Sequence, residues 1–229
     1  MNLSSIRSKE VIFDSIVGRE PAGGTSARLV RVHFQQAASL VIAVADWVEL
    51  GLKLGMSVDF ELYAELRMRA TDAEVEQKAL SYLTGRVKTA QHVQQYLLRR
   101  GCPEDAVERV MQRLYDKGIV DDEAYAVMFV EAARNKVGQR QIWMRLRQRG
   151  VAPEIARTAI AKTISEESQL EAALQCALKY VRRRGEMKDR NDKLRLISHL
   201  QQKGFTMDIA RKTVEAVEHM DEGPSTPFS

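Results

Sequence analysis

The chain has 229 residues, of which 45% are hydrophobic and 29% are charged, and its formal net charge is +4. This composition is typical of a soluble globular protein, and 6% aromatic residues with five prolines argue against an all-β fold and extensive disorder. No apolar run approaches the roughly 18 residues of a membrane span, and residues 1–14 lack the apolar core of a signal peptide. We therefore expect a cytoplasmic protein without membrane contact, in which Cys102 and Cys176 remain free thiols.

The first 70 residues contain three short runs typical of β-strands, at 11–17, 28–34 and 40–48. In the middle run, Val30, Val32 and Phe34 follow the period of a strand that has one buried face. The sequence Pro-Ala-Gly-Gly at 21–24 indicates a turn. Asp59 is placed to cap a helix that runs to residue 70, so we predict a small β-containing N-terminal module.

After residue 70 the apolar residues follow a helical spacing throughout. Asp72 is placed to cap a first helix, in which Val75 and Ala79 share one face. A second helix begins at Thr89, and a third begins at Pro103. The same three-helix pattern then recurs twice, with helices predicted at 121–135, 139–149, 153–164, 168–184, 191–203 and 207–220.

A glycine separates the second helix from the third in each set of three. These glycines are Gly101, Gly150 and Gly204, which stand 49 and 54 residues apart. Glycine ends a helix easily because it adopts the left-handed backbone conformation without strain. Recurrence at this period indicates stacked units that share a core with their neighbours. We predict a mainly α protein in which tandem three-helix repeats form an elongated array after the N-terminal module. The expected domains are 1–70, 71–120, 121–165 and 166–220, followed by a flexible tail at 221–229.

The motifs of common catalytic and cofactor sites are absent from the sequence, including phosphate-binding glycine loops, metal-spaced Cys and His clusters and serine nucleophile motifs. The histidines are scattered and are expected to be surface or partly buried residues, at His33, His92, His199 and His219. Asp121, Asp122 and Glu123 stand where a helix begins, so helix capping explains them better than a cation site. Trp143 lies in an apolar helical stripe and is expected to pack in the core. We predict no enzymatic activity, no cofactor and no metal.

Positive charge is concentrated in the second and third repeats. Residues 134–162 contain eight Lys and Arg against one acid, and residues 182–212 contain ten against four. A charge run is often only a solvated face, but clusters in adjacent repeats can form one basic surface for an acidic protein or for nucleic acid. The candidate partner-binding residues are Arg140, Arg145, Arg147, Arg149, Arg182, Arg183, Arg184, Lys188, Arg190, Lys193 and Arg195.

The segment 97–161 carries an ordered series of glycines, aspartates and apolar residues. Along the chain these are Arg100, Gly101, Leu114, Gly118, Ile119, Val120, Asp121, Asp122, Tyr125, Ala126, Lys136, Gly138, Ile142, Leu146 and Gly150. In this order and spacing they resemble the RecX family of regulatory proteins, and the resemblance extends over roughly 75–220. The run LGLKLGMSVD at 50–59 is similar to the β-module of longer family members. The chain departs from the family at His92, where an acidic residue is usual.

The resemblance implies a non-enzymatic protein that binds RecA, the recombinase that forms a helical filament on single-stranded DNA. Family members lie in the groove of the filament and inhibit its ATP hydrolysis, strand exchange and coprotease activity. On this interpretation the basic residues pair with acidic filament surface, with a possible weak contact to DNA, and the protein acts as a monomer. Arg140, Arg145, Arg147 and Arg149 are the first candidates, because Arg145 and Arg149 are neighbours on one helix face.

Two other functions fit the same pattern of helices. Helix, glycine turn and helix is also the outline of a helix-turn-helix protein that binds DNA directly. Against that interpretation, the helix at 153–164 offers Arg157 and Lys162 among alanines and isoleucines, and has no Asn or Gln to read adenine. A general scaffold of helical repeats would bind a partner without changing recombinase turnover.

Overall fold

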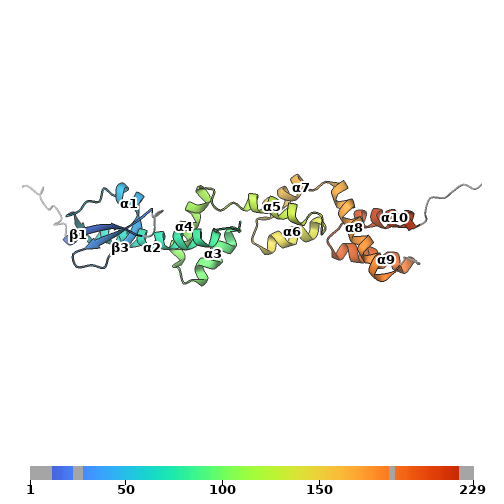
Figure 1. Ribbon diagram of the computed structural model, residues 1–229, viewed down its shortest axis with the longest axis horizontal. Coiled ribbons are helices and arrows are strands. Elements are labelled where there is room, and N and C mark those ends of the chain that lie inside the picture. The colour runs from blue at the N-terminus through green and yellow to red at the C-terminus, as the bar shows by residue number, and fades with distance from the viewer. Residues whose placement is uncertain (1–11, 23–27, 186–188, 222–229) are drawn as a thin grey trace, which may run out of the picture. The chain divides into compact units, whose positions relative to one another are not determined.

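The computed structural model describes residues 12–22, 28–185 and 189–221, which form two compact units (Figure 1). The first unit comprises the described residues up to Arg86 together with Val93–Lys117. The second comprises Val87–His92 together with the described residues from Gly118 onward. Within these described ranges, no helix combines the length and the apolar character that crossing a membrane requires.

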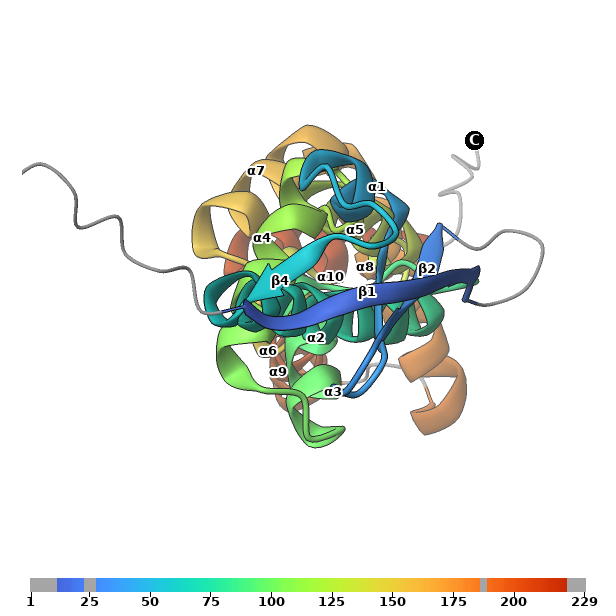
Figure 2. The same cartoon turned by 90° about the vertical axis from the view of Figure 1, so that its left-hand side faces the viewer.

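The first unit opens with an antiparallel sheet. Its described strands are β1 (Ile12–Pro21), β2 (Leu29–Phe34), β3 (Leu40–Ala43) and β4 (Ser57–Asp59), in the order β3-β2-β1-β4. Figure 2 shows β1 and β4 side by side. Ile16, Val32 and Val58 are fully or almost fully buried and pack in one core with Leu66 of α2 (Phe60–Leu83). The predicted β-containing module is therefore confirmed, and α2 packs against its sheet.

The third predicted strand is shorter than expected, because residues after Ala43 turn into the helix α1 (Val44–Glu49). The apolar run 40–48 is typical of a strand, but Asp46 stabilises the start of a helix within it. The Asp46 carboxylate accepts a hydrogen bond from the Ala43 N–H at 3.3 Å, which closes the first turn of α1. The helix then buries Trp47 in the core of the sheet. In the predicted turn at 21–24, Gly23 and Gly24 lie outside the described residues.

The prediction that Asp72 caps a helix is wrong. Helix α2 begins after Asp59, whose carboxylate accepts from the Leu62 N–H at 2.7 Å as predicted, and runs unbroken to Leu83. Asp72 lies in the middle of α2, so no free N–H group is near it. The expected boundary near residue 70 therefore falls inside a helix that the β-containing module and the first repeat share.

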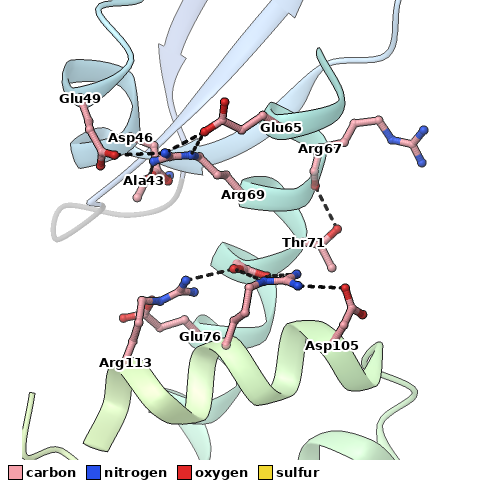
Figure 3. Close-up of polar contacts among 12 residues, drawn as sticks. Ala43, Asp46, Glu49, Glu65, Arg67, Arg69, Thr71, Glu76, Asp105 and Arg113 are labelled. Atoms are coloured by element: carbon pink, nitrogen blue, oxygen red, sulfur yellow. Dashed lines mark hydrogen bonds and ion pairs between the residues drawn. The ribbon is translucent and has the colours of Figure 1, made fainter. Parts of the chain in front are cut away.

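Asp72 is instead the acceptor of two arginines from α4 (Glu104–Asp116), of which Arg113 is labelled in Figure 3. Its carboxylate oxygens lie 2.8 Å from Nη2 of Arg109 and 3.0 Å from Nη1 of Arg113. Only 7% of the Asp72 side chain is exposed, so these bonds replace the water that a buried carboxylate loses. Arg109 also reaches Asp105 at 3.0 Å, one turn away on α4.

One turn earlier on α2, Arg69 makes a second network (Figure 3). It donates to Asp46 at 2.7 Å and to Glu49 at 3.1 Å, both on α1, and to Glu65 at 2.9 Å on its own helix. Arg69 therefore binds the first half of α2 to α1, and Asp72 binds the second half of α2 to α4. The long helix connects the sheet to the first repeat through charge-assisted hydrogen bonds as well as apolar packing.

The helices of the three repeats lie close to the predicted positions, and the tandem three-helix organisation is confirmed. The first repeat combines the end of α2 with α3 (Ala90–Arg99) and α4. The second contains α5 (Asp122–Ala133), α6 (Gln139–Gln148) and α7 (Pro153–Thr163), and the third contains α8 (Glu166–Arg184), α9 (Arg190–Gln202) and α10 (Met207–Asp221). The second and third repeats each have their own apolar core, around Ile142 and Leu146 and around Leu196 and Leu200. The elongated arrangement of the array stays a prediction.

The repeated glycines end their helices as predicted, with backbone φ angles of 74°, 82° and 89° at Gly101, Gly150 and Gly204. Gly204 has a second role, because the backbone of the preceding repeat is in direct contact with it. The Gly138 N–H donates to the Lys203 carbonyl at 2.9 Å, and the Arg140 N–H donates to the Gly204 carbonyl at 3.2 Å. A Cβ on Gly138 would overlap the backbone of Gly204 and Phe205. Gly138 itself has φ −73° and ψ 160°, which any residue adopts, so close approach explains this glycine.

An equivalent contact lies one repeat earlier, inside the second compact unit. The Thr89 hydroxyl donates to the Arg149 carbonyl at 2.8 Å, and the side chain of Gln91 fills the space beside Gly150. The next backbone N–H is bound in the same way in both places. Ala90 donates to the Asp122 carboxylate at 2.9 Å, and Gln139 donates to the Gln169 amide oxygen at 3.0 Å. We use the term inter-repeat joint for either set of contacts, the one around Gly150 or the one around Gly204.

Replacing Gly138 by alanine should destabilise the protein far more than replacing Gly101. Alanine at Gly138 must push two backbones apart, which we expect to lower the free energy of unfolding by about 3 kcal/mol or more. Gly101 has open space around its Cβ position, so Gly101→Ala meets only the left-handed backbone strain of roughly 1–2 kcal/mol. Urea unfolding of both full-length variants measures the difference. Equal losses would show that the joint does not hold these backbones together.

Asp72→Asn should lower the free energy of unfolding by about 1–3 kcal/mol, because two arginines lose their buried ionic acceptor. Asp105→Asn removes the same charge from the same Arg109, but 71% of the Asp105 side chain is exposed, and we expect little change. Chemical unfolding of the two variants tests this. A similar effect of both substitutions would mean that Asp72 contributes no more than a surface ion pair.

Candidate partner-binding surface

The four predicted arginines of α6 and its C-cap, Arg149, divide into two pairs. Arg147 donates from Nη1 to the Val151 carbonyl at 2.5 Å, and Arg149 donates from Nη1 to the Arg145 carbonyl at 3.0 Å. The Arg149 guanidinium also lies 4.7 Å from the ring centroid of Phe129. These two side chains stabilise the C-terminal end of α6, where positive charge is favourable. The guanidinium groups of both residues therefore already use part of their hydrogen-bonding capacity within the protein.

The other two arginines of α6 have no side-chain partner among the described residues. Arg140 is exposed at the first turn, and Arg145 is half-buried one turn further along. The buried face of α6 consists of Ile142 and Leu146, which leaves these arginines at its margin. Arg140 and Arg145 are therefore the members of the group that can bind a partner without breaking an internal contact.

The predicted basic residues of the third repeat are also unequal. Lys193 forms an ion pair with Glu218, and Arg195 forms one with Asp192 at 3.3 Å. Arg182, Arg183 and Arg184 are exposed at the C-terminal end of α8, and Arg190 is exposed at the start of α9. Lys188 lies outside the described residues.

Five cationic side chains surround a groove of about 530 Å³ between α8, the end of α9 and the segment before α6. We call it the basic groove, and its cationic residues are Lys136, Lys179, Arg183, Arg184 and Lys203. No carboxylate lines it among the described residues. Tyr180 and His199 form its aromatic part, with ring centroids 4.7 Å apart, and the Arg184 guanidinium lies 5.5 Å from the Tyr180 ring.

The titratable groups of the basic groove reflect its burial and its positive charge. Burial lowers the pKa of His199, and the charges of Lys203 and Arg184 lower it further. Burial raises the pKa of the Cys176 thiol, although Lys203 and Lys179 act in the opposite direction. Cys176 Sγ lies 3.8 Å from Nε2 of His199. A neutral imidazole and a neutral thiol therefore line a groove whose remaining charges are positive.

Two of the five cations of the groove, Arg183 and Arg184, are among the predicted partner-binding residues. Lys136 and Lys203 belong to the predicted charge clusters but were not candidates, and Lys179 lies outside both clusters. The spacing of Lys179 and Arg183 places them one turn apart on the same face of α8, which is a usable signal. Lys136 and Lys203 come together only through the inter-repeat joint, which the sequence does not reveal.

Asp121 caps α5 as predicted, and its carboxylate accepts from the N–H groups of Glu123 and Ala124 at 2.9 Å. Asp122 has a different role, because it is buried and binds the Ala90 N–H of the inter-repeat joint. Burial raises its pKa. Trp143 packs against the core of the second repeat, as predicted. His92, the departure from the family pattern, places Nδ1 2.9 Å from the hydroxyl of Thr89 in the joint.

Comparisons with known proteins agree with this organisation. Residues 77–114 match the first three-helix domain of RecX, residues 121–160 the second and residues 166–214 the third. Regulatory protein RecX of Leuconostoc mesenteroides is 30% identical over 185 residues, which is 79% of this chain and 69% of that protein. Regulatory protein RecX of Listeria monocytogenes is 26% identical over 188 residues, 74% of this chain and 70% of that protein.

Two solved structures share the fold. A crystal structure of regulatory protein RecX has a TM-score of 0.78 at 22% identity, and covers 88% of this chain and 99% of its own. A crystal structure of RecX from Lactobacillus salivarius has a TM-score of 0.60 at 24% identity, and covers 65% of this chain and 97% of its own.

The division of the α6 arginines predicts different effects of charge reversal on stability. A chain with Arg140→Glu and Arg145→Glu should lose less of its melting temperature, because neither side chain has an internal partner among the described residues and only Arg145 lies in the last turn of α6. A chain with Arg147→Glu and Arg149→Glu should melt several degrees lower, since it loses two bonds to carbonyls and places negative charge at a helix C-terminus. Thermal unfolding followed by circular dichroism compares the two. Equal melting temperatures would mean that the internal bonds of Arg147 and Arg149 contribute nothing.

Proposed function

Because the chain belongs to the RecX family of regulatory proteins, we propose that it binds the RecA recombinase filament and inhibits its activities. The inhibited activities are ATP hydrolysis, strand exchange and coprotease function, and the processes affected are DNA recombination, DNA repair and the SOS response. The observation that supports this most is the succession of three RecX three-helix domains along one chain. The protein acts by binding, as a monomer in the cytoplasm, and not as an enzyme.

The contacts of the second compact unit suit such a role. Two repeats are held together there by backbone hydrogen bonds at the inter-repeat joint, so they can present basic groups at a fixed spacing. Arg140, Arg145 and the basic groove are cationic without an internal ion pair among the described residues. Complementary charge of this kind speeds encounter with an acidic surface and selects against basic ones.

The helix after the glycine turn of the second repeat is not well suited to reading bases. Arg157 of α7 forms an ion pair with Glu154 at 3.2 Å, and Lys162 is its other cation. This argues against direct DNA binding as the function. The experiment below distinguishes filament regulation from direct DNA binding and from inert scaffolding.

Preformed RecA filaments should lose ATPase activity when this protein is added at a small fraction of the RecA concentration. A regulator that acts along the filament does not need free DNA, whereas a competitor for bare DNA loses its effect once RecA occupies the strand. The assay follows steady-state ATP hydrolysis on single-stranded DNA before and after addition of the full-length protein. Raising the salt concentration should weaken inhibition, because charge pairs at an exposed interface are screened over about 10 Å at 0.1 M.

The control is the same assay with the protein added before RecA. Inhibition only in that order of addition would favour plain DNA binding. Unchanged hydrolysis in both orders, together with binding to the filament in a sedimentation assay, would favour a scaffold. The full chain is the right material for these tests, since a cut near residue 72 would divide α2 and remove its Asp59 cap.

A further inference from the structure

The basic groove differs from the other charged surfaces of the third repeat in how its cations are balanced. Lys193 and Arg195 have carboxylate partners, and Lys212 pairs with Glu166 at 2.5 Å. The five cations of the groove have no ion pair among the described residues, and they surround one cavity. Like charges held at one site repel each other, so this arrangement costs stability in the free protein. A bound anion would remove that cost.

The neighbouring groups of the groove do not supply the missing negative charge. Cys176 is held as the thiol by burial, and His199 as the neutral imidazole by burial and by Lys203 and Arg184. The amides of Asn135 and Gln175 complete the polar lining. Amide and ammonium donors together can satisfy several anionic oxygens at once.

The size of the groove fits side chains better than a whole folded surface. Its volume of about 530 Å³ lies in the range of roughly 300–1,000 Å³ found for clefts that enclose small ligands. Lys136 and Lys203 line the cavity together with Lys179 and Arg183 of α8. A short extended segment with several carboxylates can pair with cations from all three elements.

The aromatic groups argue against a single strand of nucleic acid as the occupant. Sequence-tolerant binding of single strands depends on aromatic rings on which bases stack. The Tyr180 ring is already in contact with His199 at 4.7 Å and with Arg184 at 5.5 Å. A base would have to displace one of these groups, whereas a carboxylate needs only the cationic donors.

We propose that the basic groove binds a carboxylate-rich segment of the protein partner. This inference rests on the proposed function, in which the partner is the RecA filament, and it adds the chemistry of the recognised segment. It also shifts the main binding contact from α6 to the groove between α8 and α9, with Arg140 and Arg145 as additional contacts.

A matched pair of full-length double variants tests the groove. The first, Lys179→Gln with Arg183→Gln, removes one lysine and one arginine charge from the groove. The control, Lys162→Gln with Arg211→Gln, removes the same two charges from exposed positions of α7 and α10 outside the groove. The probes are a synthetic oligo-glutamate peptide and an oligo-thymidylate strand, with affinity measured by fluorescence anisotropy at low salt. Circular dichroism confirms that both variants fold.

The groove variant should bind oligo-glutamate about tenfold more weakly than the wild type, and the control should bind nearly as well as the wild type. Equal losses in both variants would show a general effect of net charge and overturn the proposal, as would unchanged binding by the groove variant. Tighter binding of oligo-thymidylate that depends on Lys179 and Arg183 would overturn it in favour of a nucleic-acid site.

The filament assay separates this inference from the proposed function. If the wild type inhibits preformed filaments and the groove variant inhibits equally well, the groove proposal fails and regulation of RecA stands. If oligo-glutamate binds through the groove but the wild type does not inhibit RecA, the proposed function fails and the groove still recognises carboxylates. Loss of inhibition in the groove variant, with normal inhibition by the control, would support both.

Discussion

The close approach of two backbones at Gly138 and Gly204 sets the geometry of the second compact unit. A side chain at either position would hold the repeats apart, and the hydrogen bonds from Gly138 N–H and Arg140 N–H could not form. Backbone groups bonded in this way cannot slide, because each unpaired N–H or carbonyl in a buried contact would cost free energy. Side-chain packing alone would tolerate small shifts between repeats. The inter-repeat joint therefore makes two small helical cores behave as one unit.

The same joint builds the basic groove. Lys136 precedes Gly138 by two residues, and Lys203 directly precedes Gly204, so the contact that joins the repeats also brings these two lysines to one cavity. The remaining cations come from the outer part of α8, which packs against α9 in the core of the third repeat. The groove therefore depends on the contact between the two repeats and would be lost if they separated.

Sequence periodicity predicted the helices well, because their apolar stripes and glycine ends are local properties. It could not distinguish the three repeated glycines, since each ends a helix in the same way, although only Gly150 and Gly204 also have a neighbouring segment against them.

Asp72 was placed at a helix start because aspartate is common there. Its true partners, Arg109 and Arg113, are 37 and 41 residues away. The strand assigned to 40–48 failed at Asp46 for a similar reason, because a helix cap and a distant Arg69 outweigh a local preference for extended structure. For the candidate site, the charge clusters contain four of the five cations of the basic groove, all but Lys179, together with cations such as Lys193 that have carboxylate partners. A count of charges along the chain cannot separate these two groups, because the folded structure decides which cations are paired.

The residue before the second helix makes different hydrogen bonds in the third repeat. In the first two repeats, the residue before the second helix, Thr89 or Gly138, gives a hydrogen bond to the following repeat. The equivalent residue of the third repeat is Asp189, whose carboxylate accepts from the Asp192 N–H of its own helix at 2.8 Å. The Thr89 hydroxyl donates to a carbonyl of the following repeat, whereas a carboxylate only accepts and would be costly to bury against the carbonyls of a backbone turn. The Asp189 carboxylate thus binds within its own repeat, whereas Thr89 and Gly138 each bind a carbonyl of the repeat that follows.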